Sequence, residues 1–189
     1  MEPSYTPRPG DIFLTQIGGL LGLVIRVLQG LLVGDWSRYT HAGIVLEDGW
    51  IIAAQPRGAR IDPITTIIDS RPLAVLPVPP WAESRRSEIV ETAKTFECHP
   101  YGFLDYLYIG LMRVERKIGT RVTPRWLQNF VSSDSTLICS ALADKVWCMS
   151  GIHLFDDGRL HGEVSPGDLA HVGWTYHVGT GPYETAGTK

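Results

Sequence analysis

Apolar and polar positions in the first half of the chain follow the short alternations that are typical of β-strands. A Pro-Gly-Asp turn at 9–11 leads into a short apolar strand at 12–14. Residues 40–55 have the pattern of a β-hairpin, in which the strands HAGIVL and WIIAAQ flank Glu-Asp-Gly at 47–49. Asp-Gly between two apolar runs is a strong hairpin signal. A further strand is predicted over 73–78, before the proline-rich stretch that closes this half.

The second half of the chain repeats its apolar residues at helical spacing. The predicted helices cover 83–96, 103–118 and 126–131. A fourth helix carries Cys139 and follows a polar cluster at 132–135 that is able to cap it. An alternating segment at 172–178 predicts a closing strand. Because the strands and helices are segregated along the chain, the predicted class is α+β.

Composition narrows the class of protein. A chain of 189 residues with 44% hydrophobic and 20% charged residues suits one soluble globular domain. The net charge of −3 gives no electrostatic footprint for nucleic acid, so we expect no nucleic-acid partner. Three cysteines cannot all pair, which argues against a disulfide framework and suits a reducing compartment or a reactive thiol.

Neither a secretion signal nor a clear membrane span is predicted. The N-terminal segment has no basic region leading into an apolar stretch, so we expect cytoplasmic synthesis. The longest apolar run, at 17–33, contains four glycines and has Arg26 near its middle. It is at the lower length limit for spanning, and a central arginine is costly in a bilayer. We expect a buried or groove-lining helix, with contact to a membrane surface through 17–33 as a less favoured alternative.

Cys139 and His41 are the residues most suited to nucleophilic chemistry. Cys139 lies where a polar loop enters a helix, and a thiol in a first helical turn feels the positive end of the helix dipole, which favours the thiolate. Backbone N–H groups there can also stabilise an oxyanion. A nucleophilic cysteine needs a base within hydrogen-bond reach. His41 begins a strand directly after a polar stretch, so we expect it to meet Cys139 across a cleft.

The two motifs together resemble a known superfamily. WSRYTHAGIVLEDGWIIAAQPRG at 36–58, followed by LICSAL at 137–142, resembles the permuted NlpC/P60 superfamily, which includes YiiX-like and lecithin:retinol acyltransferase-like proteins. PRPGDIFL at 7–14 and SPGDLA at 165–170 resemble its flanking segments, so the resemblance covers roughly 8–178. It implies a single circularly permuted papain-like domain over 1–189, with a small antiparallel sheet packed against helices. It also implies Cys139 as nucleophile, His41 as base and no cofactor.

One position departs from that pattern. The resemblance calls for a polar third residue about 12 positions after the catalytic histidine, where this chain has Ala53. Gln55 faces the same side of the strand by the period of two, and its amide oxygen can accept from an imidazole N–H. We therefore assign the orienting role to Gln55, with Asp62 and Glu47 as weaker alternatives.

The other candidate residues also have purely structural interpretations. Trp36, Tyr39 and Arg57 flank the proposed site and are expected either to line a substrate groove or to pack the hairpin. Cys98 and Cys148 are expected to be small core hydrophobes. No metal site is expected, because the zinc-binding HExxH and paired-cysteine spacings are absent around the remaining histidines: His153, His161, His171 and His177.

The resemblance implies acyl transfer through a thioester on Cys139. The implied substrates are peptide amides of the bacterial cell wall, or lipid esters and amides. We expect a cysteine-dependent amidase or peptidase acting on cell-wall peptide, released on lysis or assembled into a larger particle such as a phage tail. Two alternatives stay open: a non-catalytic binding or structural module that keeps the fold, favoured by Ala53, and a lipid acyltransferase or esterase, favoured by the run at 17–33.

Overall fold

The computed structural model describes part of the chain. Described are residues 5–18, 22–23, 26–27, 30, 37–55, 57–68, 72–100, 115, 119–120, 138–173 and 175–180. The helix predicted at 126–131, nearly all of the helix predicted at 103–118, the polar cluster at 132–135 and most of the run at 17–33 lie outside these residues.

The centre of the fold is a six-stranded antiparallel sheet with the order β4-β3-β2-β1-β5-β6. The strands are β1 (Ile12–Thr15), β2 (His41–Val45), β3 (Trp50–Gln55), β4 (Gly58–Pro63), β5 (Pro72–Leu76) and β6 (Tyr176–Thr180). The predicted strand at 12–14, hairpin at 40–55 and strand at 73–78 are therefore confirmed to within two residues. The closing strand lies at 176–180 rather than 172–178, and β4 is an additional strand.

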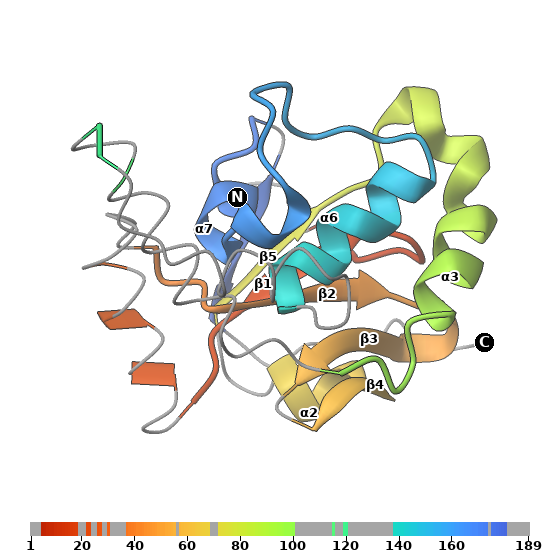
Figure 1. Ribbon diagram of the computed structural model, residues 1–189. Helices are drawn as coiled ribbons and strands as arrows, with labels where there is room; N and C mark the ends of the chain where they lie inside the picture. The colour runs from red at the N-terminus through yellow and green to blue at the C-terminus, as the bar shows by residue number, and fades with distance from the viewer. Residues whose placement is uncertain are drawn as a thin grey trace.

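Helices pack on this sheet, which confirms the α+β class. They are α2 (Ile64–Ile68), α3 (Arg86–Lys94), α6 (Cys139–Met149) and α7 (Pro166–Ala170), with short 3₁₀ turns η2 (Glu47–Gly49), η3 (Pro80–Arg85) and η4 (His161–Glu163). In Figure 1, α6 lies along β2 and α3 stands beside it, while α2 lies on the opposite side of the sheet below β3 and β4. Within the part of the chain described, no helix has the length and apolar character needed to cross a membrane.

Both faces of the sheet are buried, each in its own hydrophobic cluster. The cluster on the α6 face includes Ile12, Leu14, Ala42, Ile44, Ile52, Cys139 and Val146. The cluster on the opposite face includes Phe13, Val45, Ile51, Ala53, Ile64 and Val75. Residues therefore alternate between the two clusters along β1, β2, β3 and β5, as the period of two requires.

The turn between β2 and β3 explains the Asp-Gly signal in the sequence. Asp48 has φ 54° and Gly49 has φ 76°, two consecutive residues in the left-handed region. Glycine enters this region without a steric penalty, and aspartate is among the few other residues that tolerate it. The turn thus sets the register that pairs Ile44 with Ile52 and Val45 with Ile51.

Asp11 of the Pro-Gly-Asp turn anchors the start of β1. Its carboxylate is fully buried. One oxygen accepts from the backbone N–H of Val78 at 2.9 Å and from the guanidinium of Arg86 at 2.7 Å. The other oxygen accepts from the backbone N–H of Arg8 and from the hydroxyl of Tyr5, both at 2.8 Å. This one side chain joins the N-terminal segment, the segment after β5 and the start of α3.

Helix α6 begins at Cys139, as predicted, and its first turn lies in the apolar core. Ile138 is the N-cap residue, and no side chain caps the helix at this position. Ile138 is fully buried. The polar cluster at 132–135, which was predicted to cap this helix, lies outside the described residues, so its capping role stays a prediction.

Candidate active site

Cys139 is the first residue of an eleven-residue helix that packs against β2 and β3. Its side chain belongs to the cluster on the α6 face and has 0% exposure. All three cysteines of the chain are thiols. The position gives Cys139 the positive end of the α6 dipole, which stabilises a thiolate.

His41 is the first residue of β2 and pairs with Thr15 of β1. Its side chain is 4% exposed. Its ring lies edge-on to Phe13, with the ring centroids 6.1 Å apart and an interplanar angle of 68°. Phe13 itself lies opposite Gly43, where an added Cβ would come within 2.6 Å of the phenyl ring. The glycine in the HAGIV motif therefore makes room for the ring that supports the imidazole.

The side chains of Cys139 and His41 lie on opposite faces of the sheet. Cys139 shares its cluster with Ala42 and Ile44, whereas His41 alternates with them along β2 and contacts Phe13 of the opposite cluster. Each is, however, the first residue of its element, and α6 runs along β2 from the same end in Figure 1. A Cys139–His41 pair therefore has to form around the end of β2, not across its face. The pair stays a prediction.

Gln55, the assigned orienting residue, ends β3. Its side-chain amide donates from Nε2 to Oδ2 of Asp62 on β4, at 2.7 Å. The structure thus brings Gln55 together with Asp62, the weaker alternative for the same orienting role. Ala53 is fully buried in the cluster opposite α6.

The residues expected to line a groove fall into three different settings. Trp36 lies outside the described residues. Tyr39 is buried in the cluster that contains Cys139, and this burial raises the pKa of its hydroxyl, while Arg38 acts in the opposite direction. Its burial favours the packing alternative. Arg57 is exposed in the turn between β3 and β4.

A different thiol and imidazole, those of Cys148 and His153, lie in contact at the C-terminal end of α6. The sulfur of Cys148 is 3.5 Å from Nδ1 of His153, just after the helix ends. Burial and, secondly, the carboxylate of Asp144 raise the pKa of the Cys148 thiol. A thiol with a raised pKa is a poor nucleophile near neutral pH, so this pair is a weak rival for the proposed site. The sequence spacing of five gave no helical reason to expect the contact, because it forms across a helix end.

Neither Cys98 nor Cys148 is the core residue that was expected. Cys98 is exposed and Cys148 is partly buried. Cys98 follows α3 in a left-handed conformation, with φ 65°, and its backbone N–H donates to the carbonyl of Ala59 at 2.8 Å. The chain turns outward there to cover the edge of β4, which leaves the Cys98 side chain at the surface.

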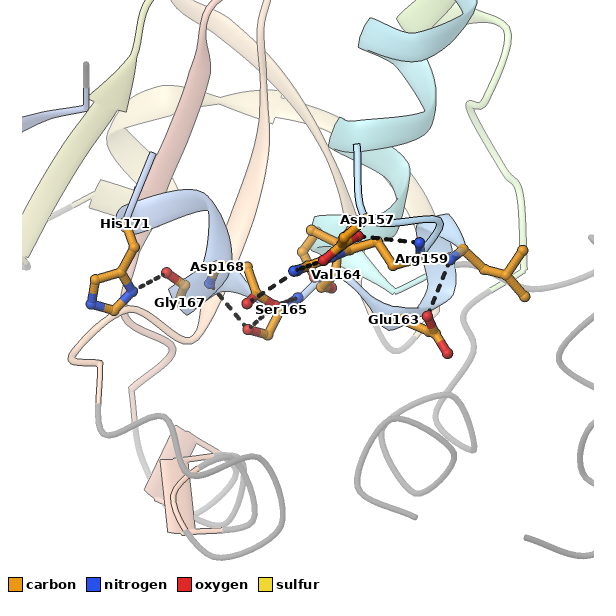
Figure 2. A network of polar contacts seen from close by, with 10 residues as sticks. Asp157, Arg159, Glu163, Val164, Ser165, Gly167, Asp168 and His171 are labelled. Atoms are coloured by element: carbon orange, nitrogen blue, oxygen red, sulfur yellow. Dashed lines mark hydrogen bonds and ion pairs between the residues drawn. The ribbon is translucent and has the colours of Figure 1, made fainter. Parts of the chain in front are cut away.

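The segment SPGDLA forms α7 and a polar network around it, shown in Figure 2. Ser165 is the N-cap: its Oγ accepts from the N–H of Asp168 at 3.1 Å, and its N–H donates back to the Asp168 carboxylate at 2.8 Å. Arg159 lies 3.3 Å from the same carboxylate. The sequence signal for this short helix is Ser-x-x-Asp, a capping-box pattern.

The residues after α6 tie α7 to the helix that carries Cys139. The hydroxyl of Ser140 is buried and donates to the carbonyl of Val164 at 2.7 Å. Nδ1 of His161 lies 2.5 Å from the carboxylate of Asp144. These contacts give Ser140 and His161 structural partners. Over the described residues, no three side chains of the types that bind metal ions gather into a site.

A cavity of about 670 Å³ lies elsewhere, beside the segment that follows β5. Its lining includes Tyr5, Arg8, Val78 and Trp81, and neither Cys139 nor His41. Trp81 is 66% exposed. The cavity is therefore separate from the candidate dyad.

Comparison with known proteins adds no relative. No protein-family model matches the chain, and no curated protein matches its sequence at a significant level.

Proposed function

We propose that the chain is a cysteine-dependent amidase or peptidase, with Cys139 as nucleophile, His41 as base and Gln55 as the residue that orients the imidazole. The observation that carries the proposal is the placement of the two reactive residues. Cys139 begins α6, α6 packs against β2, and His41 begins β2.

The chemistry follows from these side chains. His41 takes the thiol proton of Cys139, and the thiolate attacks the carbonyl carbon of an amide. The C–N bond breaks as the imidazolium protonates the departing amine, which leaves a thioester on Cys139. Water, deprotonated by His41, then hydrolyses the thioester and restores the thiol. N–H groups at the start of α6 are suited to stabilise the negative oxygen of each tetrahedral intermediate.

Peptide amides of the kind found in cell walls are the substrate class that the family resemblance implies. A papain-like domain of the permuted NlpC/P60 type is the fold that goes with this proposal. The α+β architecture, with its antiparallel sheet packed under the cysteine helix, is consistent with it.

A non-catalytic binding module is the second candidate, and the burial of both candidate catalytic side chains favours it. Cys139 has 0% and His41 4% exposure, and residue 53 is alanine instead of a polar residue. A substrate reaches a fully buried sulfur only after the surrounding chain opens. A module that keeps the fold without turnover needs no such opening.

Thiol reactivity separates the two candidates. Alkylation of Cys139 by iodoacetamide is followed by mass spectrometry in a background with Cys98→Ser and Cys148→Ser. If the dyad exists, His41→Ala slows alkylation at pH 7 on the order of tenfold, because the thiolate loses its imidazolium partner. His171→Ala, at the exposed end of α7, is the matched control and leaves the rate unchanged. Equal rates in the parent and His41→Ala would exclude the enzyme and favour the binding module.

A further inference from the structure

The cavity beside Trp81 has no part in the candidate dyad. Its volume is about 670 Å³, within the range of about 300–1,000 Å³ that is usual for ligand sites. Three segments line it: residues 77–81 after β5, Tyr5 and Arg8 of the N-terminal segment, and Glu83 of η3 with Arg86 of α3. Because this described lining has neither a thiol nor an imidazole, the cavity is suited to binding instead of nucleophilic catalysis.

The carboxylate of Asp11 holds the three walls of the cavity together. It accepts from the hydroxyl of Tyr5 at 2.8 Å, from the backbone N–H of Val78 at 2.9 Å and from the guanidinium of Arg86 at 2.7 Å. The same nitrogen of Arg86 donates to the carbonyl of Pro9 at 2.6 Å. A site whose walls are already fixed needs little ordering when a ligand arrives, which removes part of the entropy cost of binding.

Trp81 and its neighbours form an apolar wall that suits proline rings. The Trp81 side chain is 66% exposed, and no hydrogen bond joins its indole N–H to any residue in the described part of the chain. Beside it lie Val78 and three prolines, and a proline has no backbone N–H to donate. Pro79 itself, with φ −58° and ψ 146°, has the polyproline II conformation. The wall is therefore apolar, and the N–H of an exposed indole ring is available to donate.

The charges around the cavity cancel. Arg8 and Glu83 form an ion pair in which their side chains are 54% and 42% exposed. Arg86 pairs with Asp11 and also lies 2.9 Å from Glu83. Two guanidinium groups thus face two carboxylates, which leaves no net charge to attract a nucleic acid or an anionic lipid surface. The complementary occupant is uncharged and apolar.

We propose that this cavity binds a neutral, proline-rich segment of a partner protein in the polyproline II conformation. Such a segment has no internal hydrogen bonds, so its carbonyls are free to accept. Its proline rings pack against Trp81 and the proline wall, as in other aromatic-lined grooves that bind proline-rich segments. Its carbonyls accept from the indole N–H of Trp81 and from the exposed guanidinium of Arg8. The inference is independent of the proposed function, because the cavity and the candidate dyad share no residue.

The test is an NMR titration of the ¹⁵N-labelled full chain with a decapeptide of L-proline whose ends are blocked. The indole N–H resonance of Trp81 is identified by its absence from the spectrum of Trp81→Phe. This resonance is expected to shift and to saturate, because the indole N–H gains an acceptor and the ring gains contacts. The decapeptide of D-proline has the same composition but the opposite helical hand, so it is expected to bind about tenfold more weakly or less.

Substitutions at two exposed tryptophans locate the binding, with affinities measured by isothermal titration calorimetry. Trp81→Ala is expected to weaken binding of the L-proline peptide on the order of thirtyfold, because an aromatic anchor carries much of the energy of such a contact. Trp81→Phe keeps a ring but removes the N–H, and a loss of about threefold to tenfold is expected. Trp50→Ala is the matched control: Trp50 is 44% exposed, begins β3 and lies outside the cavity, so the affinity is expected to stay unchanged.

Four results would overturn the proposal. They are a Trp81 resonance that does not shift at millimolar peptide, equal binding of the L- and D-proline peptides, and a loss in Trp50→Ala as large as in Trp81→Ala. The fourth is binding of decanoate in the cavity without binding of the L-proline peptide, which would assign the cavity to a small amphipathic molecule. None of these results bears on the dyad, which is tested separately by the alkylation of Cys139.

Discussion

Replacement of Asp11 by asparagine is expected to destabilise the fold by about 3–5 kcal/mol, because every described partner of this carboxylate is a donor. Val78 and Arg86 donate to one oxygen, and Arg8 and Tyr5 donate to the other. Asparagine has nearly the same shape but only one acceptor. In either orientation of the amide, its NH₂ group faces a backbone N–H that cannot accept, that of Val78 or that of Arg8, so at least one hydrogen bond is lost. The guanidinium of Arg86 loses its buried charged partner and keeps only the half-exposed Glu83.

The magnitude follows from the burial of both charges. The side chain of Asp11 is 0% and that of Arg86 13% exposed. Hydrogen bonds to charged groups contribute about 1.5–3 kcal/mol each, and removal of one partner from a buried ion pair typically costs about 3–5 kcal/mol. A typical domain has a total stability of about 5–15 kcal/mol, so this one substitution should remove a large fraction of it.

Urea unfolding followed by tryptophan fluorescence measures the loss of stability. The urea concentration at the midpoint should fall, while the dependence of the unfolding free energy on urea stays the same. Asp157→Asn is the control, because Asp157 pairs with Arg159 at a site where the aspartate side chain is 48% exposed, and exposed pairs contribute below about 1 kcal/mol. A double-mutant cycle with Arg86→Met isolates the coupling of the buried pair. A loss for Asp11→Asn no larger than that of the control would refute the reasoning.

Two further predictions concern titrating groups. Burial and the nearby Asp11 raise the pKa of the Tyr5 hydroxyl above its usual value near 10. The contribution of Tyr5 to stability is therefore complete below pH 10 and falls as the pH rises above that value. Tyr5→Phe should flatten the decline in the free energy of unfolding that is measured between pH 9 and 11. A decline that is unchanged in the variant would contradict this prediction. Burial and the Asp144 carboxylate raise the pKa of Cys148, so Asp144→Asn should speed its alkylation at pH 8 by a few fold, as the pH profile moves to lower values. A profile that stays in place would show that Asp144 has no such influence.

Local sequence determined those elements of the fold whose turn residues and apolar pattern lie within a few positions of one another. The hairpin at 40–55 was predictable because Asp48 and Gly49 suit two left-handed positions, and its flanking strands alternate in the right register. The positions of Cys139 at a helix start and of His41 at a strand start were predictable for the same reason. Both depend on a local change of pattern, from a polar loop to an apolar element.

Tertiary contacts decided what no local pattern encodes. Strand β4 has the sequence GARIDP, which is poor in strand-forming residues, yet it forms because β3 pairs with one side of it and Cys98 and His99 bond to Ala59 on the other. The packing of α6 against β2 buries Ile138 and Cys139, and no local pattern in the sequence specifies this degree of burial.

The candidate site shows the same division. Sequence spacing predicted the roles of Cys139, His41 and Gln55, but the bond from Gln55 to Asp62 depends on the twist and pairing of β3 and β4. Contacts between residues far apart in the chain, or across a helix end as for Cys148 and His153, arise only when separate elements pack. Sequence alone therefore determined which residues are chemically suited to a site, because propensity and capping act over a few positions. Tertiary structure decided which of them touch and how far solvent reaches them, because burial and hydrogen-bond geometry are properties of the packed chain.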